Sequence, residues 1–262
     1  MRILISLFFL LITTSSFAVT FDGKFNQGSF ILGKTEPGSE VFIDKKKVKV
    51  TPDGYFVFGL GRDRKNDIVI TINKKKIIKK VFKREYKIQK IDGLEEKKVT
   101  PPEEVYERIK RENKWIGEAR AINSDLTFFK NKFAIPVENA IITGVYGSQR
   151  VLNGKPKWPH YGLDFAADEG TKIKAMLDGT VTLAEPDLFY TGGTLIFDHG
   201  HGISTLYMHM EKILVKKDQK VKQGDIIGTV GSTGRATGAH LDVRLNWFQT
   251  RLDPATVLDI NN

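Results

Sequence analysis

Residues 240–245 read HLDVRL, a strict alternation of polar and apolar side chains. On a β-strand this alternation places His240, Asp242 and Arg244 on one face and the three aliphatic side chains on the other. A strand of this kind is half-buried, and its polar face needs partners. The segment therefore predicts a β-strand with a polar site on one face.

A second expected strand, residues 204–209, reads STLYMH. Residues 205, 207 and 209 are predicted on one face, with Leu206 and Met208 on the other. The strand adds His209 to a group of histidines that all lie in one stretch of the C-terminal half. The five are His160, His199, His201, His209 and His240.

A third segment, residues 160–164, holds His160 and Asp164 four positions apart. Pro159, Gly162 and the lack of a helical period exclude a helix that would bring the two side chains together. On a straight strand they share a face but stand about 13 Å apart, at roughly 3.3 Å per residue. We therefore expect a bend at Gly162 if both side chains are to reach one ion. Any one histidine alone is more simply a structural residue, whereas a zinc site is the more economical account of the set.

Ordered blocks within residues 133–258 resemble the lysostaphin- and LytM-type zinc metallopeptidases, which cut peptide cross-links in bacterial peptidoglycan. The matching pieces are His160-x-x-x-Asp164, DHGHG at 198–202, YMH at 207–209, VKQGDIIG at 221–228 and GSTGRATGAHL at 231–241. The resemblance implies a mainly β protein whose C-terminal domain is a compact antiparallel β-structure, the duplicated hybrid motif fold, with a substrate groove.

The resemblance also implies roles for individual residues. His160 and Asp164 would be ligands of one Zn²⁺ per chain, and His209 and His240 would be the paired catalytic histidines. His199 would be structural and His201 variable. Family members usually have a histidine where this chain has Asp242, so we expect Asp242 to be the third ligand. Zinc with two aspartates and one histidine has a formal charge of zero, and the activity depends on whether Asp242 can serve as this ligand.

The 262-residue chain has no Cys and a net charge of +10. Its composition excludes collagen-like, disulfide-stapled and wholly disordered proteins. Residues 19–100 carry 20 Lys and Arg against 11 Asp and Glu, whereas residues 101–262 carry 20 of each. The basic charge therefore belongs to the N-terminal part and the histidines to the C-terminal part. We expect separate modules, with no nucleic acid as a partner.

Four regions are expected. Residues 1–18 are a secretory signal peptide, and residues 133–262 are the peptidase domain. Residues 19–90, with short alternating runs separated by turns, form a small basic β-sandwich that loosely resembles bacterial immunoglobulin-like modules. Its lysines are expected to be a solvated surface, with attraction to an anionic envelope as the functional alternative.

Residues 91–132 are expected to be a connector with one helix. Thr100 is the expected N-cap, followed by two prolines and by Glu103 as a capping-box carboxylate. The helix is expected to end before Asn123. No catalytic chemistry is expected of it.

The first residues carry an export pattern. Arg2 precedes an apolar run at 3–12, and small residues at 16 and 18 predict cleavage after Ala18. The run is too short to span a bilayer, for which about 20 residues are needed. We expect a mature protein without a transmembrane segment, secreted to the periplasm.

The expected function is a secreted zinc endopeptidase that hydrolyses peptide cross-links in peptidoglycan, with stem peptides as partners. The alternative is a degenerate relative that binds the cell wall or activates an amidase. Degenerate relatives lose several site residues together, whereas here only position 242 differs. A third possibility is a basic envelope-binding protein with a purely structural C-terminal module. Bound metal after purification separates the first function from the other two.

Overall fold

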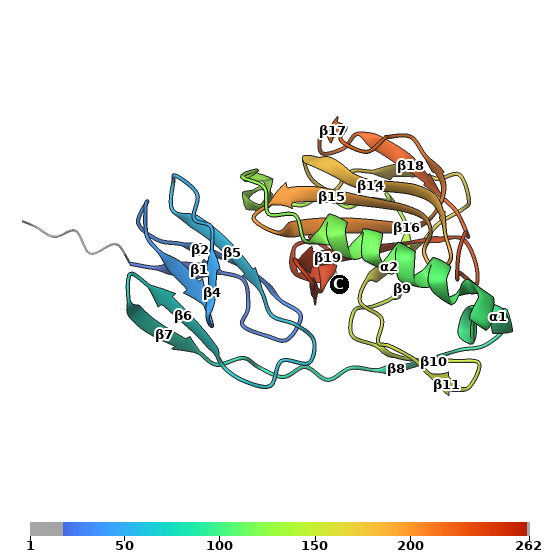
Figure 1. Cartoon of the computed structure of the whole chain (residues 1–262), viewed down its shortest axis with the longest axis horizontal. Coiled ribbons are helices and arrows are strands. Elements are labelled where there is room, and N and C mark those ends of the chain that lie inside the picture. The colour runs from blue at the N-terminus through green and yellow to red at the C-terminus, as the bar shows by residue number, and fades with distance from the viewer. Residues whose placement is uncertain (1–17, 261–262) are drawn as a thin grey trace, which may run out of the picture.

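The computed structural model describes residues 18–260 and is mainly β, with one long helix across the C-terminal part (Figure 1). The expected signal peptide lies outside the described residues except for Ala18. Within residues 18–260, no helix is both long and apolar enough to cross a membrane.

The N-terminal part consists of two small antiparallel sheets, whose buried residues belong to one continuous core with those of the C-terminal part. One sheet has the order β1-β2-β5, formed by β1 (Thr20–Asp22), β2 (Phe30–Lys34) and β5 (Tyr55–Gly59). The other has the order β4-β3-β6-β7, formed by β3 (Val41–Ile43), β4 (Lys46–Val48), β6 (Ile68–Ile72) and β7 (Lys75–Lys79). Alternating aliphatic residues, such as Ile68, Ile70 and Ile72 on β6, supply the core.

The C-terminal part is built on a ten-stranded sheet whose main path is β17-β14-β15-β16-β19-β12-β9. The strands of this path are β9 (Ile141–Gly144), β12 (Leu163–Ala166), β14 (Gly179–Leu188), β15 (Gly192–Gly200), β16 (Ile203–Ile213), β17 (Lys220–Val221) and β19 (His240–Trp247). Off this path lie β13 (Lys172–Lys174), β18 (Ile226–Val230) and β20 (Thr250–Leu252). All pairs in the sheet are antiparallel. Both expected strands are confirmed, because residues 204–209 lie in β16 and residues 240–245 lie in β19.

Helix α2 (Tyr106–Arg120) covers one face of this sheet (Figure 1). Its Ala119 packs with Leu206 and Met208 in a small core, whereas Tyr207 points into the main core on the opposite face. The strand β16 is therefore buried on both faces rather than on one. Glu112 on α2 is buried and accepts hydrogen bonds from Arg108 Nε at 2.6 Å and from the backbone N–H of Phe189 at 2.8 Å. The bond from Phe189, which follows β14, fastens the helix to the sheet, and the bond from Arg108 lies within the helix.

The expected N-cap at Thr100 was wrong. Thr100 ends a short helix, α1 (Glu96–Val99), by donating its backbone N–H to Glu96, because the following prolines cannot continue it. A 3₁₀ turn, η1 (Glu103–Val105), follows, and α2 begins only at Tyr106. The expected end of the helix before Asn123 is confirmed. The two other 3₁₀ turns are η2 (Phe128–Lys130) and η3 (Pro254–Thr256).

The N-terminal sheets pack directly on the C-terminal part. A Cβ added to Gly59 of β5 would lie 2.4 Å from Leu252 Cδ2, and Arg84 Nη1 lies 2.7 Å from the buried carboxylate of Asp253. A third sheet also joins the two parts. In it β8 (Ile88–Ile91), which crosses the expected boundary at residue 90, pairs in parallel with β10 (Gln149–Leu152), and β10 pairs with β11 (Lys155–Pro156).

Candidate metal centre and groove

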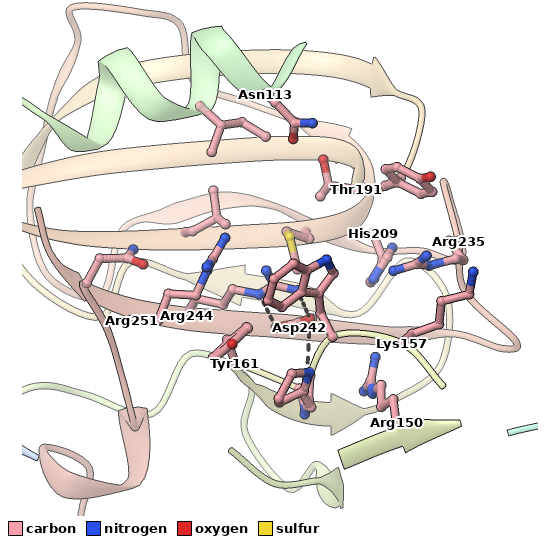
Figure 2. A pocket seen from close by; sticks show the side chains of 18 of the residues that line it. Asn113, Arg150, Lys157, Tyr161, Thr191, His209, Arg235, Asp242, Arg244 and Arg251 are labelled. Atoms are coloured by element: carbon pink, nitrogen blue, oxygen red, sulfur yellow. Dashed lines mark hydrogen bonds and ion pairs between the residues drawn. The ribbon is translucent and has the colours of Figure 1, made fainter. Parts of the chain in front are cut away.

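A groove of about 670 Å³ lies between helix α2 and the ten-stranded sheet (Figure 2). Its lining includes Asn113 of α2, Leu206 and Met208 of β16, and Asp242 and Arg244 of β19. The segment 157–161, which precedes β12, forms another wall. Asp242 and Arg244 of the polar face predicted for residues 240–245 therefore line a groove, whereas His240 lines an adjacent cavity.

The three expected metal ligands converge: His160 and Asp242 line this groove, and Asp164 lines an adjacent cavity together with His240. One ligand atom from each of His160, Asp164 and Asp242 lies within 4.8 Å of the others, and all three residues are buried. Asp164 of β12 and Asp242 of β19 are direct partners in the register of the two strands. His160 precedes β12, and the chain bends at Gly162 before the strand begins, as expected.

Two glycines make room for the carboxylates of Asp164 and Asp242. A Cβ at Gly162 would lie 2.0 Å from Asp242 Oδ1, and a Cβ at Gly144 would lie 2.1 Å from Asp164 Oδ2. Both distances are far below van der Waals contact, so any side chain at either position would displace a carboxylate. The bend at Gly162 thus also provides space for Asp242.

The residues present fit a bound cation. His160 Nδ1 lies 3.3 Å from the carbonyl oxygen of Val145, which can only accept a hydrogen bond, so Nδ1 carries a proton and a bound cation would take the lone pair of Nε2. His160 Nε2 then faces Asp164 Oδ1 at 3.0 Å and Asp242 Oδ2 at 3.3 Å. Asp164 Oδ1 is buried without a hydrogen-bond partner in the described part of the chain. One imidazole nitrogen and two carboxylate oxygens are a donor set that zinc accepts.

His209 and His240 form a pair beside these ligands. Their ring centroids are 4.7 Å apart. The Nδ1 atom of His209 lies 2.8 Å from the carbonyl oxygen of Thr233, and that of His240 lies 2.9 Å from the carbonyl oxygen of Gly238. Each neutral ring therefore donates from Nδ1 and has a free lone pair at Nε2. Burial, with a smaller contribution from His240, lowers the pKa of His209 to about 4, so this ring is neutral at pH 7.

The predicted face of His209 was wrong. Leu206, Met208 and His209 all line the groove, whereas Tyr207 points into the main core. The reason is a positive φ of 64° at His209, which breaks the alternation of β16. This unusual backbone places His209 on the same side of the sheet as Asp242 (Figure 2).

Residues 158–254 match the family model described as Peptidase family M23. The chain carries an M23 peptidase domain. This match confirms the expected resemblance to peptidoglycan-cutting zinc metallopeptidases and, with the β-sheets described above, the expected fold class.

Relatives of the M23 domain include two curated proteins. Peptidoglycan DD-endopeptidase ShyA of Vibrio cholerae is 45% identical over 87 residues, which cover 33% of this chain and 20% of that protein. DD-carboxypeptidase/endopeptidase Mpg of Neisseria meningitidis is 39% identical over 89 residues, which cover 33% of this chain and 20% of that protein. The chain thus matches about a fifth of the length of these relatives.

One solved structure extends the similarity beyond the M23 domain. It is a crystal structure from Pseudomonas aeruginosa assigned to peptidase M23, with a TM-score of 0.69 and 27% identity. The match covers 89% of this chain and 95% of that one. The N-terminal β region and the M23 domain therefore occur together in a known structure.

The carboxylates of Asp164 and Asp242 each have a cationic partner. Arg150 Nη2 lies 2.8 Å from Asp164 Oδ2, and Arg244 Nη2 lies 3.0 Å from Asp242 Oδ2. Burial alone would raise the pKa of both carboxyls, but His160 and the guanidinium groups outweigh it and hold both pKa values below the ordinary range. The expectation of a neutral site counted only the ligands and the ion, whereas the two arginines add positive charge next to them.

The remaining histidines of the M23 domain lie outside the groove lining. His199 is fully buried, with Nδ1 2.7 Å from the carbonyl oxygen of Asp178 and Nε2 2.8 Å from Thr205 Oγ1. His201 packs on Phe129, with ring centroids 4.7 Å apart. These contacts agree with a structural role for His199.

Most of the cations of the groove have no signal in the sequence. They come from α2, β10, β19, β20 and two loops, and only Arg244 lies on the alternating strand predicted at 240–245. The lining cations are Arg120, Arg150, Lys157, Arg235, Arg244 and Arg251. Because the whole region 101–262 is neutral, its net charge gave no signal of this local concentration.

Proposed function

We propose that this protein is a zinc-dependent endopeptidase that hydrolyses peptide cross-links in bacterial peptidoglycan. The observation that carries the proposal is the convergence of His160, Asp164 and Asp242 beside the pair His209 and His240, with His160, His209 and Asp242 open to the groove. The names of the two curated relatives support peptidoglycan peptides as the substrate.

His160, Asp164 and Asp242 would hold one Zn²⁺, which acts as a Lewis acid toward a scissile carbonyl and makes water more acidic. The chain's own residues handle the protons. Nε2 of one histidine of the pair accepts a proton from the attacking water and, once protonated, gives that proton to the leaving amine. The other histidine can donate a hydrogen bond from Nε2 to the developing oxyanion only in its protonated form, because its Nδ1 is already bonded to a carbonyl. The carbonyls of Thr233 and Gly238 hold both rings with Nε2 available.

The test is digestion of purified peptidoglycan by the wild-type protein and by His209→Ala, with the released peptides identified by mass spectrometry. We expect cleaved cross-links with wild type and a loss of about 10²- to 10⁴-fold in rate for the variant, the range typical of acid–base groups. Zinc content and circular dichroism must be the same in both. A zinc-loaded wild type that sediments with peptidoglycan but releases no cleaved peptide would instead favour a degenerate binding module or an amidase activator.

We also propose that the protein acts outside the cytoplasm, in the periplasm, after removal of a signal peptide at Ala18. The support is the peptidoglycan named for the curated relatives and the export pattern of residues 1–18. Mass spectrometry of the protein recovered from a periplasmic extract should give Val19 as the first residue. An N-terminus at Met1 in that extract would contradict the cleavage.

Finally, we propose that residues 19–90 bind the anionic envelope through their positive charge, and that residues 133–262 hydrolyse the peptide cross-links. Residues 91–132 connect these two regions. Exposed lysines on the N-terminal sheets support the first part, including Lys74, Lys75 and Lys76. Binding of the full chain to anionic vesicles should weaken steeply with salt, because exposed charges are screened beyond about 8 Å at physiological ionic strength. Replacing these three lysines by glutamine should reduce binding at low salt. Equal binding by both proteins would leave the lysines as solvated surface.

A further inference from the structure

The groove is strongly cationic. In the described part of the chain, its lining contains five arginines and one lysine, whereas Asp242 is the one carboxylate that lines it. The cations lie on two sides of the metal-ligand cluster. Figure 2 shows Arg244 and Arg251 on one side of Asp242, and His209 and Arg235 on the other.

Three of these arginines meet at one end of the groove. Arg120 comes from the last turn of α2, Arg244 from β19 and Arg251 from β20. Arg120 is 6% exposed, and its Nε has no hydrogen-bond partner in residues 18–260. Burial and the charges of the other two arginines lower the pKa of Arg120 to about 9. Burial and Arg244 also lower the pKa of Arg251.

The three cations are poorly balanced by anions. Arg244 pairs with Asp242, which also faces His160. Arg120 Nη2 reaches only the carbonyl oxygen of Phe248, at 3.3 Å. The Arg251 guanidinium stacks on the ring of Tyr161, with Cζ 4.7 Å from the ring centroid, which fixes its orientation without neutralising it. Buried charges of one sign are costly unless paired, so this end of the groove favours an anionic ligand.

We propose that Arg120, Arg244 and Arg251 form a subsite for a free carboxylate of the peptide substrate. The proposal rests on the peptidase function given above. Guanidinium groups match carboxylates through paired hydrogen bonds. Arg244 and Arg251 lie on one side of Asp242 and His209 on the other (Figure 2). The carboxylate would therefore lie on the side of Asp242 away from His209.

The test measures binding separately from cleavage. Cross-linked peptides released from purified peptidoglycan are used with all carboxyls free, with only the C-terminal carboxyls amidated, or with all carboxyls amidated. Their dissociation constants are measured by calorimetry on zinc-loaded His209→Ala, alone and combined with Arg251→Gln, Arg251→Lys or Arg111→Gln. Arg111 is an exposed residue of α2 outside the groove, so its replacement controls for the lost charge.

Amidation of all carboxyls should weaken binding to His209→Ala about tenfold, as expected for a charge-assisted pair. Arg251→Gln should weaken binding of the free peptide by a similar factor and respond less than twofold to amidation, with Arg251→Lys intermediate and Arg111→Gln unchanged. If amidation of the C-terminal carboxyls alone already weakens binding, a C-terminal carboxyl is the ligand. If only amidation of all carboxyls weakens binding, the ligand is an internal carboxyl. Equal binding of free and amidated peptides overturns the subsite. If wild type binds free peptides in this manner but cuts none of them, the subsite stands and the peptidase function falls.

Discussion

Arg244 donates to Asp242 Oδ2, the same carboxylate oxygen that faces the imidazole of His160. A histidine at position 242 would remove the ion pair with Arg244. The Arg244 guanidinium would then lie beside the bound Zn²⁺ without a neutralising carboxylate. We therefore expect Asp242→His to bind zinc about tenfold or more weakly than wild type, although it restores the ligand usual in the family. Adding Arg244→Gln should recover affinity in the Asp242→His background. Competition with a chromophoric chelator measures all four proteins of the cycle, and tighter zinc binding by Asp242→His alone would contradict the expectation.

Gly162 should be irreplaceable for steric reasons. Its φ is not positive, but a Cβ there would meet Asp242 Oδ1 at 2.0 Å and the carbonyl oxygen of Val243 at 2.7 Å. Gly162→Ala should therefore lose stoichiometric zinc. The matched control is Gly61→Ala, whose Cβ would make an ordinary 3.5 Å contact with Thr250. Elemental analysis of both purified proteins provides the measurement, and a full zinc complement in Gly162→Ala would show that Asp242 is not a ligand.

The buried His199 should make stability depend on pH. Burial lowers its pKa from 6.5 to about 4 in the folded chain, so between these values the unfolded chain binds more protons. The stabilisation is complete above pH 6.5 and is lost as the pH falls toward 4. It amounts to about 3 kcal/mol, because each pKa unit corresponds to about 1.4 kcal/mol.

Urea unfolding of wild type and His199→Gln at pH 7.5, 5.5 and 4.5 tests this dependence. His201 and His209, whose pKa values are also lowered to about 4, remain in both proteins. The difference between wild type and variant should therefore shrink with falling pH. A constant difference would assign the pH dependence to other groups.

Glu112 should anchor helix α2. Replacing it by alanine removes the acceptor for Arg108 and leaves the backbone N–H of Phe189 unsatisfied, at an expected cost of about 1–3 kcal/mol in the free energy of unfolding. Glu118→Ala is the control, because this exposed residue of the same helix lies 3.8 Å from Lys114 and should cost less than about 1 kcal/mol. Equal urea midpoints for the two variants would mean that the helix is held by its apolar contacts.

Much of the fold and of the candidate site was predictable from local patterns. The alternation at 240–245 placed Asp242 and Arg244 on one face, and the bend needed between His160 and Asp164 occurs at Gly162. The two predictions that were wrong, the face of His209 and the N-cap at Thr100, depend on backbone geometry that the alternation of polar and apolar residues does not encode. The positive φ at His209 moved that residue to the other face, and the prolines after Thr100 ended one helix instead of starting the next.

The cationic end of the groove had no sequence signal. Arg120 is more than a hundred residues from Arg244 and Arg251, and only the docking of α2 on the sheet brings it to them. Spacing rules describe neighbours within one helix or strand. A cluster assembled from three elements therefore requires the tertiary structure.

The contact between Leu252 and Gly59, together with the ion pair of Arg84 and Asp253, limits which parts of this protein can be transferred to another protein. A graft of residues 133–262 onto another carrier would uncover Leu252 and leave the buried Asp253 carboxylate without its cation. We therefore expect the proposed peptidase domain to depend on residues 19–90 for its stability. Chimeras designed to redirect it to new cell walls should carry residues 19–90 with it and change only the exposed lysines.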